Sequence, residues 1–346
     1  EQSKNKEALD AYKDAIFFKP DYAEAYNNMG NALKDLGKAG EAIEAFYKAL
    51  SINDDYIAAY YNMAPVLNGV IFEKPSKRAH NIISSLLDKG SLVRPREIAA
   101  AAISLVKLEP SLHRHLKLLH AVKKEQNPLD IVSDLSKVRL LMKLMSVCPL
   151  TDLDLEKLLK QLRALLLSTI SSLEEASPEL LKFQSALALQ CFTNEYIYSQ
   201  TKEEEKVLRS LEVTVKNTFK SNKQPSPQLI LALASYKALN KYDWSNSLLV
   251  TDDIQEVSTR QIEEPDQEEN LKLSIPRLEE ITDKVSSKVR EQYEKRPYPR
   301  WVNLGLPLKS KSISDLIKPI DLKIYDNRIT SVEMPNILVA GCGTGL

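Results

Sequence analysis

A glycine-rich segment near the end of the chain has the residue types and spacing of a cofactor-binding loop. The apolar run 336–340 has the composition of a buried strand, and it leads directly into Gly-Cys-Gly-Thr-Gly at 341–345. Alternating glycines let the backbone turn sharply and let a ligand pack where a Cβ would otherwise lie. A doubly wound sheet has such a loop after its first strand. The predicted cofactor contacts are Gly341, Cys342, Gly343, Thr344 and Gly345.

The third glycine distinguishes between two kinds of loop. A dinucleotide fingerprint, G-x-G-x-x-G, would need glycine at 346, where the chain has Leu346. Glycine at 345 gives the tighter pattern associated with S-adenosylmethionine. The alternatives are an incidental turn and a loop of another nucleotide-binding fold. Cys342 is expected to be a small filler, because no second metal ligand lies near it in the sequence.

An aromatic and basic segment precedes this loop. Pro297 and Pro299 force an extended path just after a predicted helix at 281–294. Aromatic rings and a guanidinium on this segment either line the cofactor pocket or guide a substrate, or they join the helical region to the following domain. The sequence leaves both interpretations open. The residues concerned are Tyr293, Tyr298, Arg300 and Trp301.

The elements at the other end of the chain follow a repeat. Residues 23–56 fit one tetratricopeptide (TPR) repeat, a hairpin of two helices with a period of 34 residues. Small residues, Gly30 and Ala42, are expected to face Phe46 so that the two helices pack closely. The pattern predicts a helical stack at this end.

Partial repeats lie on both sides of it. The residues up to Pro20 fit the second helix of a preceding repeat, and a third repeat starts at Ile57. The third repeat needs a short insertion, and we expect Pro65 to interrupt its first helix. About three repeats are needed for a stable stack, so further repeats are expected before Glu1.

Asparagines recur at this repeat period. Asn28 and Asn62 are 34 residues apart, at a position that lies on the concave face of a TPR stack. An asparagine amide can bond both groups of an extended peptide backbone, so two stacked amides predict a peptide-binding ladder. Neighbouring Asn27 and Asn31 add polar groups on the same side. The alternative is a common solvated position of TPR repeats.

The middle of the chain keeps a helical pattern without the repeat. Thr151 and Asp154 resemble a capping box, and Ser177 before Pro178 predicts a second long helix. The acidic, polar stretch 250–275 is expected to be an exposed connector. Two further groups are expected to be solvated rather than metal-binding or catalytic: the acidic run at 203–206 and the histidines His113, His115 and His120.

Composition restricts the class of protein. Lys plus Arg and Asp plus Glu are 47 each, which argues against general nucleic-acid binding and against a polybasic membrane surface. Only 9 residues are glycine, and three of these lie at 341–345, which favours packed helices in the rest of the chain. No apolar run is long enough to span a membrane. Three distant cysteines indicate a reduced, cytoplasmic setting.

Four motifs in this order resemble bacterial TPR-containing class I S-adenosylmethionine-dependent methyltransferases. They are the TPR at 23–56, ALALQCFTNEY at 186–196, VREQYEKRPYPRW at 289–301 and ILVAGCGTG at 337–345. The TPR is common to many proteins, whereas the other three are more specific. Ala340 departs from the pattern, since many members of the wider class have Asp or Glu there, and this puts one polar contact to the cofactor in doubt.

The resemblance implies a mainly α chain that ends in the beginning of a Rossmann-like α/β methyltransferase domain. Only the first strand and loop of a seven-stranded sheet would be present, and the acidic residue that holds the cofactor ribose would lie beyond Leu346. The implied organisation is TPR repeats at 1–90, a helical domain at 91–249, a connector with a pre-catalytic helix at 250–310 and the truncated methyltransferase domain at 311–346.

We therefore expect the parent protein to be a methyltransferase that uses S-adenosylmethionine and binds a protein or peptide through its TPR groove. Its methyl donor is already electrophilic, so catalysis needs positioning more than a protein nucleophile. The chain as given is expected to be inactive. The alternatives are a non-catalytic TPR scaffold and a TPR-fused transferase of another class. The methyl acceptor, the catalytic residues and the oligomeric state stay open.

Overall fold

The computed structural model gives a helical protein. It describes residues 2–89, 93–119, 127–170, 176–274, 283–295, 302, 312–314 and 327–332. All regular elements within these ranges are helices, which confirms the mainly helical prediction. The predicted strand and glycine loop of the Rossmann-like start lie outside the described residues.

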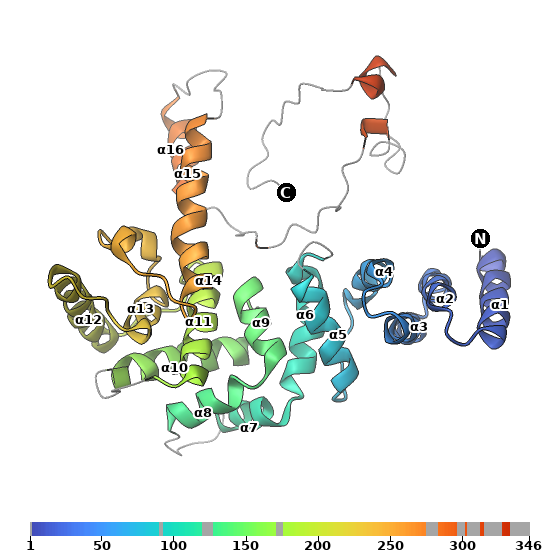
Figure 1. The fold of residues 1–346 in the computed structure, drawn as a ribbon, viewed down its shortest axis with the longest axis horizontal. Coiled ribbons are helices and arrows are strands. Elements are labelled where there is room, and N and C mark those ends of the chain that lie inside the picture. Colours follow the sequence, from blue (N-terminus) through green and yellow to red (C-terminus); the bar gives the residue numbers. More distant parts are fainter. Residues whose placement is uncertain are drawn as a thin grey trace.

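The N-terminal helices pack in sequence order, as TPR hairpins do (Figure 1). Each contacts the next along the chain from α1 to α4, and α5 continues the series against α6. Their bounds are α1 (Gln2–Phe18), α2 (Ala23–Asp35), α3 (Ala39–Ile52), α4 (Ile57–Leu67) and α5 (Lys77–Asp88).

Gly30 sets the closest approach between α2 and α3. A Cβ added at Gly30 would lie only 2.6 Å from Cε1 of Phe46, whose side chain is fully buried. Ala42 is also fully buried. The predicted arrangement of small residues facing Phe46 is therefore confirmed for Gly30, because any side chain there would overlap the ring.

Gly30→Ala is expected to lower the free energy of unfolding by about 1–3 kcal/mol through overpacking. The loss should occur although alanine has the better helix propensity, by about 1 kcal/mol. Gly40→Ala is the matched control, because nothing lies within 4 Å of a Cβ added in α3 at this position. It should raise stability by up to about 1 kcal/mol. Urea denaturation followed by circular dichroism measures both; a stabilised Gly30→Ala variant would show that the Phe46 ring can move aside.

The third helix pair corrects one prediction. α4 continues through Pro65 to Leu67, so Pro65 does not interrupt this helix. Proline conflicts with the carbonyl of the residue four positions earlier, Tyr61, and both residues are exposed, so water can solvate the freed carbonyl. The expected insertion lies in the connection at 68–75. Ser76 then caps α5. The residues that the repeat pattern assigns to the core of α5 are fully buried: Ala79, Ile83 and Leu86.

The helical layer continues past the TPR segment although the 34-residue rhythm is lost. One row of contacts runs from α2 through α4, α6, α9 and α11 to α14. A single hydrophobic cluster extends from Leu9 to Tyr198. The domain division at residues 90, 249 and 310 stays a prediction. The middle helices are α6 (Pro95–Lys107), α7 (Pro110–Leu119), α8 (Pro128–Leu135), α9 (Arg139–Val147), α10 (Leu153–Thr169), α11 (Pro178–Thr193), α12 (Lys202–Lys220) and α13 (Pro227–Ala234).

The two predicted caps of the middle region have different outcomes. Ser177 caps α11, because its side chain accepts a hydrogen bond from the backbone N–H of Leu180 at 3.2 Å. At α10, the prediction that Thr151 is the capping residue is wrong by one residue. Asp152 is the cap, and its Oδ1 accepts from the N–H groups of Asp154 and Leu155 at 3.1 Å each. Asp152 takes this place because a carboxylate both caps the first turn and favours the positive end of the helix dipole.

The expectation of an exposed connector at 250–275 is wrong for its first half. Short 3-10 turns at η2 (Leu239–Lys241) and η3 (Ser245–Ser247) lead into α14 (Gln255–Ser258), a π-helical turn η4 (Thr259–Glu263) and α15 (Glu264–Ser274). Ile254, Val257 and Ile262 are buried in a second hydrophobic cluster with α13. The alternation of acidic and apolar residues is that of an amphipathic helix. Beyond this half, α15 has no buried residue.

Gln261 fixes the π-helical turn in the core. Its Oε1 accepts from the N–H of Leu239 at 3.1 Å, and its Nε2 donates to the carbonyls of Ala188 and Ala234 at 3.2 Å each. The turn also explains how Pro265 lies within a helix, because wider π geometry removes the conflict between its ring and the carbonyl four residues earlier. The described part of the chain after this point contains α16 (Lys284–Lys295) and the 3-10 turn η5 (Asn327–Ser331).

Candidate functional site

The asparagines of α2 and α4 form a hydrogen-bonded chain. Nδ2 of Asn62 donates to Oδ1 of Asn27 at 3.0 Å, and Nδ2 of Asn27 donates to Oδ1 of Asn28 at 3.2 Å. Asn27 is 4% exposed, while Asn28 and Asn62 are half-buried. The two predicted ladder positions are thus joined through Asn27 instead of stacking directly on each other. Asn31 lies one turn further along α2, where its Oδ1 accepts from Lys34 at 3.5 Å.

This chain of amides leaves one amide nitrogen and one amide oxygen without a partner. Within the described residues, Nδ2 of Asn28 and Oδ1 of Asn62 have no hydrogen-bond partner. They terminate the chain at its two ends, so their polarity is fixed by the bonds between them. A peptide group offers one acceptor and one donor as well. The arrangement can therefore bind the backbone of an extended polypeptide.

The predicted cofactor site lies outside the described residues. This holds for the loop at 341–345 and for Tyr298, Arg300 and Trp301. The backbone of Tyr293 lies within α16. The binding of S-adenosylmethionine by these residues stays a prediction.

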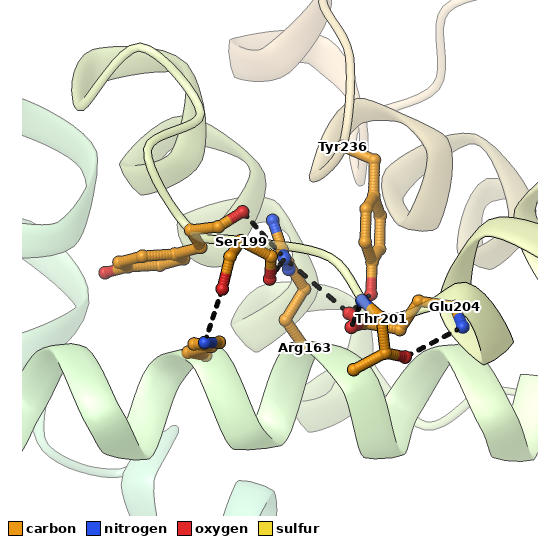
Figure 2. Close-up of polar contacts among 7 residues, drawn as sticks. Arg163, Ser199, Thr201, Glu204 and Tyr236 are labelled. Carbon is orange, nitrogen blue, oxygen red and sulfur yellow. Dashed lines mark hydrogen bonds and ion pairs between the residues drawn. The ribbon is translucent and has the colours of Figure 1, made fainter.

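A buried polar cluster lies around Arg163 of α10 (Figure 2). The Arg163 side chain is 1% exposed, and its Nη2 donates to the carbonyl oxygens of Tyr198 and Ser199 at 3.2 Å each. Nη2 also lies 3.6 Å from Oε1 of Glu204. Lys160 of the same helix donates to the Ser199 hydroxyl at 2.6 Å. Arg163 therefore connects α10 to the loop that precedes α12.

Glu204 is the counter-ion and also caps α12. Its Oε2 accepts from the backbone N–H of Thr201 at 2.8 Å, and the Thr201 hydroxyl accepts from the N–H of Glu204 at 3.1 Å. Tyr236 donates its hydroxyl to Oε1 of Glu204 at 2.7 Å. The expectation that 203–206 is solvated is wrong for Glu204, which is 7% exposed. Thr201 followed by Glu204 is a capping-box spacing, and this signal in the sequence could have found it.

The aromatic rings of this cluster stay uncharged. The Arg163 guanidinium lies 4.1 Å from the centre of the Tyr236 ring and 5.6 Å from that of Tyr198. Burial, followed by the hydrogen bond to Glu204, raises the pKa of Tyr236 above its usual range. Burial likewise raises the pKa of Tyr198. The cluster joins α10, α12, the loop between α11 and α12, and Tyr236, which follows α13.

Among the described residues, the buried thiols and the histidines belong to no group of three or more His, Cys, Asp or Glu that could hold a metal ion. Burial raises the pKa of Cys148 and of Cys191 to about 12, so both thiols stay protonated and are poor nucleophiles or ligands. His113 is exposed as expected, and His120 lies outside the described residues. The expectation is wrong for His115, which is 5% exposed with its Nε2 3.1 Å from Oδ2 of Asp134. Across the described ranges, no group of side chains could hold a metal ion.

An open surface cavity of about 480 Å³ lies between α9, α11 and the residues before α14. Its charges are mixed. An oxygen of Asp88 lies 2.5 Å from Nη2 of Arg139 and the other lies 3.1 Å from Nζ of Lys143, and Asp252 and Glu256 also line the cavity. Such exposed pairs contribute little stability and select no particular ligand.

Comparisons with known proteins identify the N-terminal segment. A family model described as TPR repeat matches residues 1–37, and one described as tetratricopeptide repeat matches residues 23–56. TPR repeats are therefore present within residues 1–56, whereas the third repeat expected from Ile57 is matched by neither model. No curated protein matches the chain, and no solved structure matches it. In the part of the chain that the structure describes, no helix is long and apolar enough to cross a membrane.

Proposed function

We propose that the concave face of the TPR repeats binds an extended polypeptide through the asparagine chain of α2 and α4. The observation that carries this proposal is the pair of polar groups at the two ends of the asparagine chain, Nδ2 of Asn28 and Oδ1 of Asn62, which are half-buried and have no partner among the described residues. They lie on neighbouring helices that contact each other. TPR repeats generally mediate protein–protein interactions, and paired amide groups favour recognition of a peptide backbone.

The double substitution Asn28→Ala and Asn62→Ala is expected to weaken peptide binding by about 10- to 30-fold. Two hydrogen bonds of about 1 kcal/mol each are lost. A peptide selected on the immobilised chain from a random display library serves as the probe, and fluorescence anisotropy measures its affinity. Asn81→Ala, an exposed asparagine on α5, is the matched control and should change nothing. The free energy of unfolding should fall by about 1–3 kcal/mol without loss of the fold, because the buried Asn27 amide loses both of its partners.

Two outcomes would contradict this proposal. Equal affinity for the wild type and the double variant would place binding elsewhere on the scaffold. A collapse of thermal stability in the double variant would make the asparagines structural. Backbone recognition itself is tested with the same peptide carrying N-methyl groups at successive positions. At least one N-methylated peptide should lose affinity, because N-methylation removes the backbone N–H from which Oδ1 of Asn62 would accept a hydrogen bond.

We further propose that the parent protein is an S-adenosylmethionine-dependent methyltransferase whose TPR groove holds the methyl acceptor or its carrier. The support for this is the sequence motif at 341–345, which follows an apolar, strand-like run. The coding sequence beyond Leu346 discriminates the alternatives. A second strand that ends in Asp or Glu about 20 residues further on would favour methyl transfer. A stop codon there would favour a non-catalytic scaffold, and another catalytic motif would favour a different transferase.

A further inference from the structure

One face of α4 is apolar and exposed. The Ile57 side chain is 48% exposed and that of Tyr61 is 56% exposed, and Pro65 is exposed as well. These residues are four apart, so they form a stripe along one side of the helix, which we call the α4 stripe. Contiguous apolar side chains on a surface mark interaction sites, whereas single ones do not.

The helix that presents this stripe has no charge of its own. No residue of α4 is acidic or basic, whereas α1, α2, α3 and α5 each contain both acidic and basic residues. A charged group placed on the stripe would lose hydration without gaining a counter-ion from α4. The stripe therefore favours an uncharged, apolar group.

The α4 stripe borders the asparagine chain. Successive residues of an α-helix are about 100° apart around its axis, so Pro65 lies about 60° and Tyr61 about 100° from Asn62, on the same side. Ala59 and Met63 lie at the same angles on the other side of Asn62, and both are fully buried. α2 and α4 contact each other and lie side by side in Figure 1. The open surface beside Asn62 on α4 is therefore the stripe.

The stripe also carries a backbone acceptor. Pro65 has no N–H, so the carbonyl of Tyr61 lacks its usual helical donor. A lipid chain can cover the apolar side chains, but it offers no donor to this carbonyl or to Oδ1 of Asn62. The apolar face of a helix from a second copy offers none either, because its N–H groups are used within that helix. An extended polypeptide supplies both backbone N–H groups and apolar side chains.

We propose that the extended polypeptide bound by the asparagine chain places a bulky apolar side chain on the α4 stripe. This inference rests on the proposed function of that chain and adds the kind of partner. The partner is a segment with an aromatic or branched aliphatic residue next to the peptide group that Asn62 binds. Side chains of an extended segment alternate between two faces, so the residue on the stripe faces the scaffold while its neighbours point away.

Tyr61→Ala is expected to weaken the binding of the display-selected peptide by about 10-fold, because truncating an aromatic side chain in an interface commonly has an effect of this size. Tyr61→Phe should bind nearly as well as the wild type, because the ring makes the contact. Val213→Ala is the matched control, since Val213 lies on α12 and is exposed to a similar degree. Fluorescence anisotropy measures the affinities, and circular dichroism checks that each variant is folded.

The peptide provides the second half of the test. One bulky apolar residue, next to the position where N-methylation abolishes binding, should lose about 10-fold in affinity when it is changed to Ala. The same change should have little effect on binding to Tyr61→Ala, because the two side chains contact each other and their effects are then not additive.

The outcomes separate this inference from the proposed function. If Asn28→Ala with Asn62→Ala weakens binding but Tyr61→Ala does not, the asparagine chain binds the peptide and the α4 stripe has no part in it. A loss in Tyr61→Phe as large as in Tyr61→Ala, or a Tyr61→Ala loss coupled to no apolar peptide residue, would also overturn the inference. Full affinity in the double asparagine variant, or no peptide enriched on the wild type, would contradict both proposals.

Discussion

Glu204→Ala is expected to lower the free energy of unfolding by about 3–5 kcal/mol, because it leaves the Arg163 guanidinium buried without a counter-ion. Arg163 is 1% exposed, so water cannot take the place of the carboxylate. The substitution also removes the acceptor for the Tyr236 hydroxyl and one half of the capping box at α12. All three losses act on the same group of helices. Urea denaturation followed by circular dichroism measures the change.

The neighbouring substitution Glu203→Ala provides the control. Glu203 lies in the same first turn of α12 but is exposed. Its loss should cost at most about 1 kcal/mol, the value of a favourable charge at a helix N-terminus. Similar small effects for both variants would mean that Glu204 is solvated and that Arg163 finds another counter-ion.

In the protein extended beyond Leu346, Gly343→Val is expected to abolish the binding of S-adenosylmethionine, with a loss of affinity of more than about 100-fold. A branched side chain would occupy the space that alternating glycines leave for the ligand. The TPR segment should keep its helical signal, because the change lies at the other end of the chain. Isothermal titration calorimetry of both proteins with S-adenosylmethionine measures the effect.

Cys342→Ala is the matched control for this experiment. We predict that Cys342 only fills space between the glycines, so alanine there should keep the affinity within a few-fold. If Gly343→Val binds as tightly as the wild type, the loop does not hold the cofactor. If Cys342→Ala loses binding to the same degree, the cysteine has a direct part in it.

The features that the sequence predicts correctly follow from local pattern, although local pattern also misplaced the cap of α10 and the end of α4. Gly30 and Phe46 belong to one repeat, and their fit depends only on the spacing within a helical hairpin. Ser177 caps the helix that it directly precedes. Asn28 and Asn62 could be placed on the first helices of two successive repeats for the same reason, but their bonds through Asn27 could not be predicted. Which amide lies between the other two depends on how α2 and α4 are rotated against each other.

The features that the sequence hides depend on distant partners. Arg163 and Glu204 lie on different helices, so neither shows in the sequence that its charge is buried and paired. His115 likewise meets Asp134 of another helix. The stretch 250–275 is acidic enough to suggest an exposed connector, while the apolar residues of its first half are buried in the same hydrophobic cluster as those of α13. In each case, the sequence pattern predicts that a segment with charged residues is exposed to solvent. The fold instead buries part of it against a distant segment.

The π-helical turn at Thr259–Glu263 fixes an angle as well as a contact. Figure 1 shows α15 extending away from the helical layer directly after this turn. Each residue of an α-helix advances the direction around the axis by about 100°, so removing one residue from the turn would rotate α15 by about that amount relative to α14. Because Gln261 is bonded to three backbone groups of the layer, it sets the azimuth from which α15 departs. The π-helical turn thus fixes the direction in which α15 extends from the helical layer.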